Sequence, residues 1–225
     1  MGPDRYIVSY TMSLLPEQQR SLSGRVLGVV IAGGRSTRFG GEKAVAGLGG
    51  RPLLMWAAAR LARSCPVLAI NARPGTEAEA LARAQGLAVL HDAAGDPAGP
   101  LSGVKAGLEW AQALGASAIA VSPCDVPLLP ENLFDRLIQA AGAGAAMAET
   151  SEGHQPQCAV WPVSALPKLA AALAHGEHPA TWMMLDSIGA VRVRFPVPEA
   201  FANLNTRADL AVIAGRLERG EIHLT

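Results

Sequence analysis

The chain has 225 residues, and 50% of them are hydrophobic and 17% charged, which is typical of a globular protein and excludes a disordered one. Lysine plus arginine and aspartate plus glutamate both total 19, and the resulting net charge of zero argues against a nucleic-acid partner. The length suits one large α/β domain or two small ones, and no apolar run reaches the roughly 18 residues of a membrane span, so no membrane partner is expected.

The first stretch, residues 1–24, carries charged side chains and lacks an apolar core of the kind found in secretory signals. We interpret it as an N-terminal extension that is poorly ordered. Residues 25–225 are then expected to form a single domain, because no low-complexity linker or internal repeat divides them.

The next hundred residues alternate short apolar runs with helical patterns. The expected strands are residues 26–31, 67–70, 87–90 and 118–121. The expected helices are residues 53–62, 76–86 and 101–114. Thr76 would begin the second helix, with Glu79 as its capping-box partner. This uninterrupted alternation predicts βαβ units with right-handed crossovers and a mainly parallel sheet, hence an α/β fold.

The second half of the chain is less regular. The expected helices are residues 130–140, 164–174, 181–187 and 206–219. The expected strands are residues 145–150, 158–161 and 191–195, with residues 151–157 connecting the first two. Thr206 is the expected N-cap of the last helix, with Asp209 at its third position.

Three loops follow expected strands directly: residues 32–43, 91–103 and 122–127. Ligands of parallel α/β sheets bind beyond the carboxyl ends of the strands. We therefore expect these three loops to meet at one edge of the sheet and to form a binding site there.

The first of these loops combines four glycines with three cations: Gly33, Gly34, Gly40, Gly41, Arg35, Arg38 and Lys43. Glycines allow backbone N–H groups to approach a ligand closely, and cations neutralise a polyanion. The loop matches neither the dinucleotide fingerprint, whose later glycines would fall on Arg35 and Arg38, nor the P-loop, since Ala44 follows Lys43. It is interpreted as a phosphate-binding loop of another kind.

Polar residues in the other loops offer further candidate ligands. Asp125 follows a strand between two prolines, where a carboxylate can hold a divalent metal or cap the next helix. Asp92 also follows a strand and is either a ligand or a loop residue. Asn203 and Asn205 would share one face of an extended segment, which suits either substrate binding or turn chemistry.

The three cysteines, Cys65, Cys124 and Cys158, show no metal-ligand spacing, and their odd number favours a reducing compartment. We accordingly expect a cytoplasmic protein. His175 and His178 are interpreted as a surface pair at a helix end.

Five motifs occur in a characteristic order. They are Gly-Gly-Arg-Ser-x-Arg-Phe-Gly-Gly-Glu-Lys at residues 33–43, Gly-Pro-Leu-Ser-Gly at 99–103, Pro-Cys-Asp-x-Pro at 123–127, His-Gln-Pro at 154–156 and Asn-x-Asn-Thr at 203–206. With these motifs the chain resembles the molybdenum cofactor guanylyltransferase family over nearly all of residues 25–219. The resemblance implies a three-layer, doubly wound, Rossmann-like nucleotidyltransferase fold.

The resemblance also implies roles for individual residues. Lys43, Arg38 and Asp125 would be catalytic, and Asp125 would also bind Mg²⁺. The nucleotide-binding half, residues 25–129, would contact the nucleotide through Ile31, Ala32, Gly33, Gly34, Lys43, Asn71, Asp92 and Asp125. The acceptor-binding half, residues 130–205, would contact molybdopterin through His154, Gln155, Pro156, Asn203 and Asn205.

The implied reaction transfers GMP from GTP to molybdopterin-bound molybdenum and releases pyrophosphate. The resemblance also implies transient contacts with molybdenum-cofactor insertion proteins or acceptor enzymes. Three departures from the family pattern stand out: Phe39 where many members have Met, Arg207 where members usually have Pro, and the run Ile70-Asn71-Ala72-Arg73, which lacks the extra Asn that members often have before the Arg. Because Phe is common at the first position in cytidylyl relatives, a cytidylyltransferase for the same cofactor is one alternative. A catalytically silent nucleotide-binding protein that hands over the cofactor is another.

Overall fold

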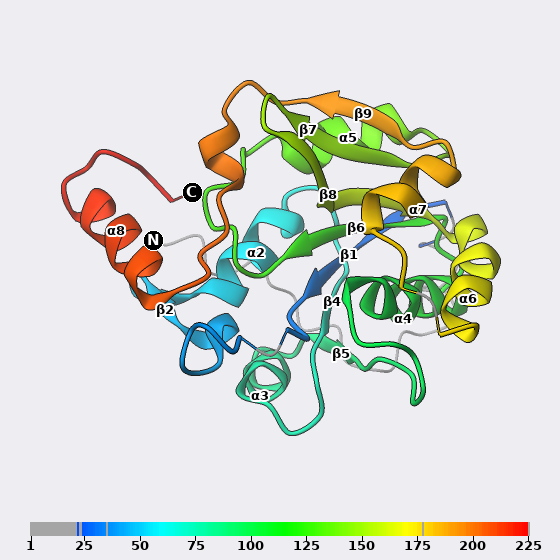
Figure 1. Ribbon diagram of the computed structural model, residues 1–225, viewed down its shortest axis with the longest axis horizontal. Helices are drawn as coiled ribbons and strands as arrows, with labels where there is room; N and C mark the ends of the chain where they lie inside the picture. The colour runs from blue at the N-terminus through cyan, green and yellow to red at the C-terminus, as the bar shows by residue number, and fades with distance from the viewer. Residues whose placement is uncertain (1–21, 23, 35, 177, 225) are drawn as a thin grey trace.

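A seven-stranded, mostly parallel sheet forms the centre of the fold (Figure 1). The computed structural model describes residues 22, 24–34, 36–176 and 178–224, so the expected extension, residues 1–24, lies almost wholly outside the described residues. The strands of the sheet are β1 (Val26–Ile31), β4 (Leu68–Asn71), β5 (Ala88–Leu90), β6 (Ala118–Pro123), β7 (Ala146–Thr150), β8 (Gly153–Pro162) and β9 (Val191–Arg194). Their order is β5-β4-β1-β6-β8-β7-β9, and within this sheet β8 is antiparallel to both of its neighbours.

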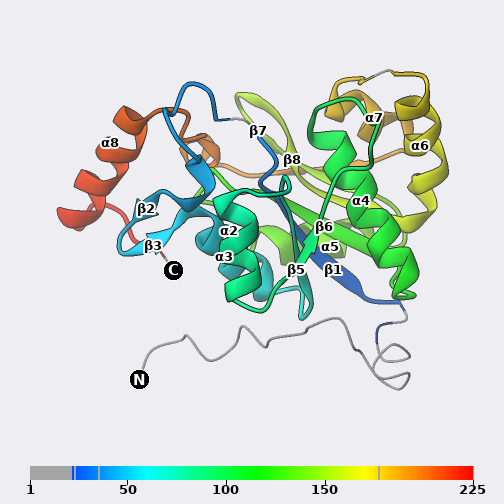
Figure 2. The ribbon, with the colours of Figure 1, turned by 90° about the horizontal axis from the view of Figure 1, so that it is seen from below.

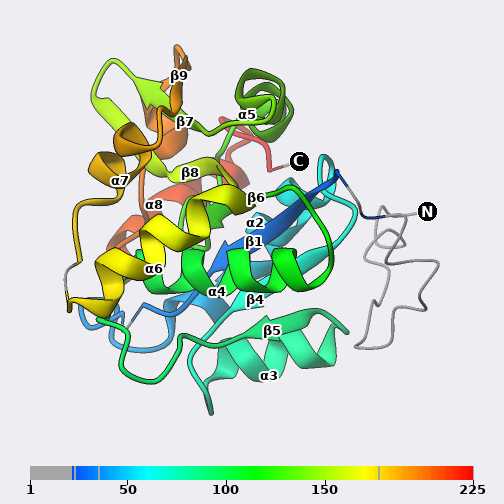
Figure 3. The ribbon, with the colours of Figure 1, turned by 90° about the vertical axis from the view of Figure 1, so that its right-hand side faces the viewer.

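Helices cover both faces of the sheet, which confirms the expected three-layer α/β fold (Figures 1 and 3). One face is covered by α2 (Leu53–Ala62), α3 (Glu77–Ala84) and α5 (Leu133–Ala141). The other is covered by α4 (Pro100–Ala113), α6 (Leu166–Ala174) and α7 (Thr181–Ser187). Among the described helices, no stretch combines the length and the hydrophobicity of a transmembrane span.

The central strands are buried on both sides, as their continuous apolar runs predict. Along β1, Val30 faces the α2 side of the sheet, whereas Leu27 and Val29 face the α4 side. The helix α4 lies close to the sheet at Gly107, where a Cβ atom would be 2.9 Å from Ile119 Cδ1 and 3.1 Å from Val29 Cγ2. This close packing fixes the first turn of α4 beside the carboxyl ends of the strands.

A smaller hydrophobic cluster joins the C-terminal helix α8 (Arg207–Glu218) to the hairpin of β2 (Gly47–Leu48) and β3 (Arg51–Pro52). Figure 2 shows the helix and the hairpin as neighbours at one end of the molecule. The buried members of the cluster are Leu48, Leu53, Leu204 and Ile213. Thr206 caps α8 and forms the expected capping box with Asp209. This cluster lies outside the two main cores, next to the short 3₁₀ helix η1 (Lys43–Val45).

The structure corrects several expected elements. The hairpin β2–β3 interrupts the alternation of strands and helices. It was not expected, because its segment is short and rich in glycine and so carries no strand pattern. The strand β8 begins at Gly153, so most of the expected connection, residues 151–157, is strand with a bulge opposite Met147 and Ala148. The helix α5 begins at Leu133 and not at residue 130, since Pro130 forms a turn in which its carbonyl accepts the Leu133 N–H.

The Gly-Pro-Leu-Ser-Gly motif, expected to precede a helix, forms its first turn, because Pro is well suited to the first helical position. Further short 3₁₀ helices, η2 (Val163–Ala165) and η3 (Pro198–Phe201), precede α6 and the last loop.

The packing of α4 on the sheet leads to a stability prediction. We expect Gly107→Val to lower the free energy of unfolding by about 1–3 kcal/mol, because its methyl groups would crowd Val29 and Ile119. Urea denaturation measures the change. The control is Gln112→Val, at an exposed position of the same helix, where only a few tenths of a kcal/mol of helix propensity are at stake. Equal losses in the two variants would contradict the close approach at Gly107.

Candidate functional site

The three expected loops do meet at one edge of the sheet. Ile31, the last residue of β1, is in register with Asn71 of β4 on one side and with Pro123 of β6 on the other. Leu90, the last residue of β5, is in register with Asn71 in turn. The chain leaves the sheet at each of these points, and the loops after β1, β5 and β6 border a cavity of about 500 Å³. This volume is in the range of sites for small molecules and cofactors.

The glycine loop is held in a defined conformation. Ser36 and Gly40 both have positive φ angles, 48° and 72°. The Phe39 N–H donates to the Ser36 carbonyl at 2.9 Å, and the Lys43 N–H donates to Ser36 Oγ at 3.3 Å. A turn therefore closes inside the loop and delivers Lys43 to the cavity.

Glu42 anchors the end of the glycine loop and does not face the cavity. Its carboxylate accepts the backbone N–H groups of Glu77 at 2.7 Å and Ala78 at 2.9 Å, which are unpaired donors in the first turn of α3. A carboxylate at a helix N-terminus is also favoured by the helix dipole. The loop is thus fixed to α3 one residue before Lys43.

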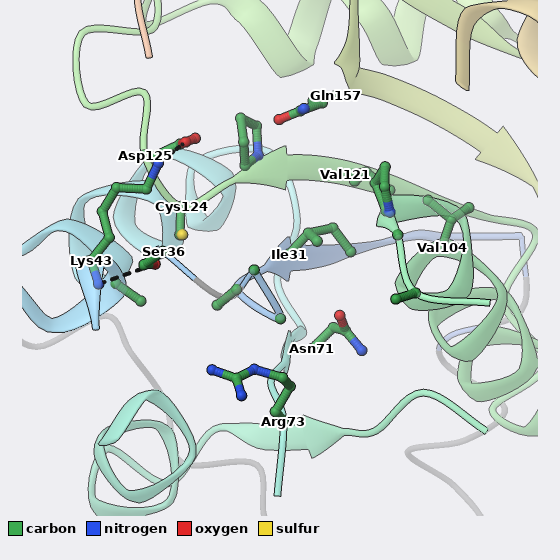
Figure 4. Close-up of a pocket in the computed structure, with 18 of the residues that line it drawn as sticks. Ile31, Ser36, Lys43, Asn71, Arg73, Val104, Val121, Cys124, Asp125 and Gln157 are labelled. Carbon is green, nitrogen blue, oxygen red and sulfur yellow. Dashed lines mark hydrogen bonds and ion pairs between the residues drawn. The ribbon is translucent and has the colours of Figure 1, made fainter. Parts of the chain in front are cut away.

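Lys43 lies at the centre of the polar end of the cavity (Figure 4). Its Nζ is 2.5 Å from Asp125 Oδ2 and 3.4 Å from Asn205 Oδ1. The Lys43 and Asp125 side chains are only 12% and 16% exposed, so solvent screens their attraction weakly. Three expected site residues from three separate loops are therefore brought into contact.

Asn205 is held at this point by the start of α8. The Leu204 N–H donates to the Asp125 carbonyl at 2.9 Å, which ties the two segments together. The Asp209 carboxylate accepts the N–H groups of Thr206 and Asn205, and these hydrogen bonds hold its pKa below the usual value.

A second polar group, Asn71 and Asp92, lines the opposite part of the cavity. Asn71 is 2% exposed, and its Nδ2 donates to Asp92 Oδ1 at 2.9 Å and to the Leu90 carbonyl at 3.4 Å. Its Oδ1 lies against α4, where a Cβ at Gly103 would overlap with it. Glycine at position 103 therefore leaves room for the Asn71 amide.

All eight expected nucleotide-binding residues border this cavity, and so does Arg38. The eight are Ile31, Ala32, Gly33, Gly34, Lys43, Asn71, Asp92 and Asp125. Arg35 lies outside the described residues. Ser102 does not line the cavity and donates instead to the Pro97 carbonyl at 2.6 Å, which braces the preceding loop.

Only some of the expected acceptor-binding residues lie at the cavity. Pro156 and Asn205 line the cavity, whereas His154, Gln155 and Asn203 do not. The His154 ring packs against Trp182 with centroids 5.8 Å apart, and its Nδ1 is 3.3 Å from Glu149 Oε1. Gln155 Nε2 donates to Thr150 Oγ1 at 3.4 Å, and Asn203 is exposed.

Four polar residues that the sequence did not single out also line the cavity: Thr37, Arg73, Gln157 and Thr181. Arg73 comes two residues after the end of β4, so its position just beyond a strand was a signal from which the sequence could have predicted it as a lining residue. In Figure 4 its guanidinium is turned toward the side where Ser36 and Lys43 lie. Gln157 and Thr181 reach the cavity through the bulge in β8 and through the packing of α7, which no local pattern predicts.

The expectation that His175 and His178 form a surface pair is wrong in part. His175 is exposed and bonds the Ala171 carbonyl of its own helix at 2.7 Å. His178 instead packs on the loop that lines the cavity, since a Cβ at Gly99 would overlap with its Nε2.

Comparisons with known proteins agree with this site. Residues 28–189 match the family described as MobA-like NTP transferase domain. A molybdenum cofactor guanylyltransferase of Cereibacter sphaeroides is 44% identical over 188 residues, which cover 83% of this chain and 94% of that protein. A protein of the same name from Rhodobacter capsulatus is 38% identical over 197 residues, or 87% of this chain and 98% of that protein.

The fold also matches solved structures. Molybdopterin-guanine dinucleotide biosynthesis protein A from Archaeoglobus fulgidus superposes with a TM-score of 0.69 at 21% identity, covering 86% of this chain and 100% of that one. The structure of 4-diphosphocytidyl-2C-methyl-D-erythritol synthase from Anaerococcus prevotii superposes with a TM-score of 0.66 at 12% identity, covering 89% and 99%. At these identities the likeness concerns the fold alone.

Taken with the cavity at the strand ends, the sequence matches define the chain as an enzyme of the nucleotidyltransferase class. It belongs to the family of MobA-like NTP transferases, and the resemblance to molybdenum cofactor guanylyltransferases that the five motifs indicated is confirmed.

The cysteines provide a test of the site's burial. All three are free and buried, and Cys124 lines the cavity. Burial, reinforced by the charge of Asp125, raises the pKa of Cys124 to about 12, and burial raises that of Cys65 to about 12 and that of Cys158 as well. Only about one thiol in ten thousand with such a pKa would be ionised near pH 8.

We therefore expect the native protein to react very slowly with Ellman's reagent, although one thiol borders an open cavity. The same protein in guanidinium chloride should release three equivalents rapidly, which is the control for thiol content. Rapid labelling of one thiol in the native state would contradict the burial of Cys124.

Proposed function

We propose that this protein transfers GMP from GTP to molybdenum-bound molybdopterin, giving the guanine dinucleotide cofactor and pyrophosphate. The observation that carries the proposal is the contact of Lys43, at the end of the glycine loop, with Asp125 and Asn205 at the carboxyl-terminal edge of the parallel strands. The names of the 44% and 38% identical relatives support the same substrate pair.

The proposed chemistry needs no protein nucleophile, because the terminal phosphate of the pterin is already an anion. One of its oxygens forms a bond to the α-phosphorus of GTP while the bond from that phosphorus to the bridging oxygen breaks. Pyrophosphate leaves with the electron pair of the broken bond. The protein's part is to align the two phosphates and to neutralise charge through Lys43 and Arg38.

Arg73 is a further candidate for the same task. It is exposed at the cavity wall and forms no ion pair with a described residue, and the same is true of Arg38. Lys43, by contrast, is already paired with Asp125. Two unpaired guanidinium groups and one ammonium would therefore surround the triphosphate.

Asp125 fits the role of a Mg²⁺ ligand. The described residues contain no group of three His, Cys, Asp or Glu side chains able to enclose a metal. Mg²⁺ is commonly held by one or two carboxylates together with substrate phosphates and water, so a single carboxylate beside the phosphate loop suffices. When bound there, Mg²⁺ would offset negative charge on the phosphates.

The opposite end of the cavity suits the nucleoside. Ile31, Ala32, Gly33 and Gly34 provide backbone and apolar surface, while Asn71 and Asp92 would contact the base or ribose. Asp92 uses Oδ1 to accept from Asn71, which leaves Oδ2 available for a ligand N–H group.

The names of the 44% and 38% identical relatives support guanine over cytosine as the base. Phe39, the residue that suggested a cytidylyltransferase, is buried and does not line the cavity. Its departure from the family pattern therefore does not bear on the choice of base.

The acceptor would occupy the side formed by the second half of the chain. Pro156 and Asn205 border the cavity itself. His154, Gln155 and Asn203 lie beyond its lining, so they would contact those parts of the acceptor that extend outside it. We retain residues 25–129 and 130–205 as the proposed nucleotide- and acceptor-binding halves.

Replacement of Asp125 tests the metal role. We expect Asp125→Ala to abolish Mg²⁺-dependent pyrophosphate release, because the phosphates lose the carboxylate that would share their metal. Circular dichroism and thermal melting should show a folded protein. The matched control is Asp135→Ala, an exposed aspartate on α5 that bonds the Ser64 hydroxyl far from the cavity. Full turnover in Asp125→Ala would remove Asp125 from the mechanism.

A pyrophosphate-release assay with molybdopterin as acceptor tests the base and the reaction together. We expect GTP to be used at least tenfold better than CTP in kcat/KM, equivalent to about 1.4 kcal/mol. Preferred use of CTP would establish the cytidylyltransferase alternative. Binding of GTP by calorimetry without any release would establish the silent handover protein.

A further inference from the structure

Arg207 of α8 lies over the glycine loop. Its Cζ is 5.5 Å from the centroid of the Phe39 ring, within the range of a cation–π contact. A Cβ at Gly41 would lie 3.4 Å from its Nη2. One guanidinium therefore covers two positions of the loop, and Phe39 and Arg207 are two of the departures from the family pattern.

The turn from Ser36 to Phe39 and the hydrogen bond from the Lys43 N–H to Ser36 Oγ both lie inside the loop, so neither ties its middle to another element. Its end is fixed by Glu42 on α3, but Gly40 and Gly41 have no side chains and Arg38 is exposed. Phe39 is 3% exposed, yet it belongs to none of the three hydrophobic clusters of the described chain. Its ring is thus buried locally, and Arg207 is the charged group seated on it.

Arg207 is itself held in place. It is the first residue of α8, whose start is set by the capping box of Thr206 and Asp209. The residue Leu204 ties the same segment to Asp125 through its backbone N–H. Arg207 forms no ion pair with a described residue, so its guanidinium is available to the aromatic face. A continuous set of contacts thus runs from Asp125 through α8 to the glycine loop.

We propose that Arg207 and Phe39 form a clasp that holds the glycine loop in its binding conformation before the nucleotide arrives. They are positioning residues that act through Arg38 and Lys43 and do not touch the substrate. A loop with two positive φ angles and two adjacent glycines would otherwise lose conformational freedom on binding, and preorganisation reduces that cost. The proposal rests on the proposed function for the identity of the nucleotide.

Two sets of variants test the clasp. Arg207→Gln and Phe39→Leu each remove one partner, and the double variant removes both. We expect each single variant to raise the Kd for GTP about two- to fivefold, as one exposed cation–π contact allows, and the double variant to add nothing further. The kcat at saturating GTP should stay unchanged, because the contact is made equally before and during the reaction.

Hydrogen exchange of residues 36–42 in the protein without nucleotide provides a second readout. We expect faster exchange in both single variants, with the melting temperature of Arg207→Gln close to that of the wild type and that of Phe39→Leu lowered, since this change also removes buried ring atoms. Arg216→Gln is the matched control, since Arg216 lies on the same helix and pairs with Glu221 away from the loop. It should change neither the exchange nor the Kd.

The outcomes separate the clasp from a direct attraction between Arg207 and phosphate. If Arg207→Gln weakens GTP binding while Phe39→Leu has no effect on binding or exchange, Arg207 attracts phosphate directly and the clasp is wrong. If the wild type binds GTP and all variants match it, the clasp also fails, although the proposed function stands. If the wild type does not use GTP, the proposed function fails, and the exchange measurement still decides whether the clasp exists.

Discussion

The ion pair between Lys43 and Asp125 is the contact on which the site depends. The two residues are 82 positions apart, and Asn205, 162 positions from Lys43, joins them. Both charged groups are largely shielded from solvent, so removing either one would leave the other buried without a counter-charge, which is energetically unfavourable. The anchoring of Glu42 on α3, the turn at Ser36 and the tie between Leu204 and Asp125 all serve to bring these charges together.

The position of this ion pair follows from the parallel sheet. In parallel strands the carboxyl ends lie at one edge, and the register of Ile31 with Asn71 and Pro123 makes three loops start side by side. The cavity therefore has a cationic end at Lys43 and a hydrogen-bonding end at Asn71 and Asp92. A nucleotide has the same polarity, with phosphates at one end and a base at the other.

The second half of the chain departs from parallel winding in a way that shapes the other wall. The antiparallel strand β8 carries a bulge that brings Pro156 and Gln157 to the cavity. The helix α7, packed on β8, adds Thr181. The last segment then returns across the sheet edge to place Asn205 beside Lys43. The second substrate would thus meet the nucleotide between two differently built walls.

Local sequence determined the first half of this fold and the centre of its site. The buried runs of β1, β4 and β6 and the helical pattern of α2 carry their own period, so their places and the meeting of their loops followed from pattern alone. The glycines and cations of residues 33–43 and the aspartate after β6 predicted the polar residues that line one end of the cavity, because short-range chemistry and strand ends suffice to locate them. Thr206 and Asp209 predicted the cap of α8 for the same local reason.

Tertiary structure decided what depends on partners distant in the sequence. The roles of Glu42 as an anchor on α3, of Gly103 as space for Asn71 and of His178 on Gly99 arise from contacts between separate elements. The same holds for the bulge in β8 and for Arg207 over Phe39. Sequence patterns report the period and chemistry of one segment at a time, whereas these features depend on how close two segments pack, which only the folded chain defines.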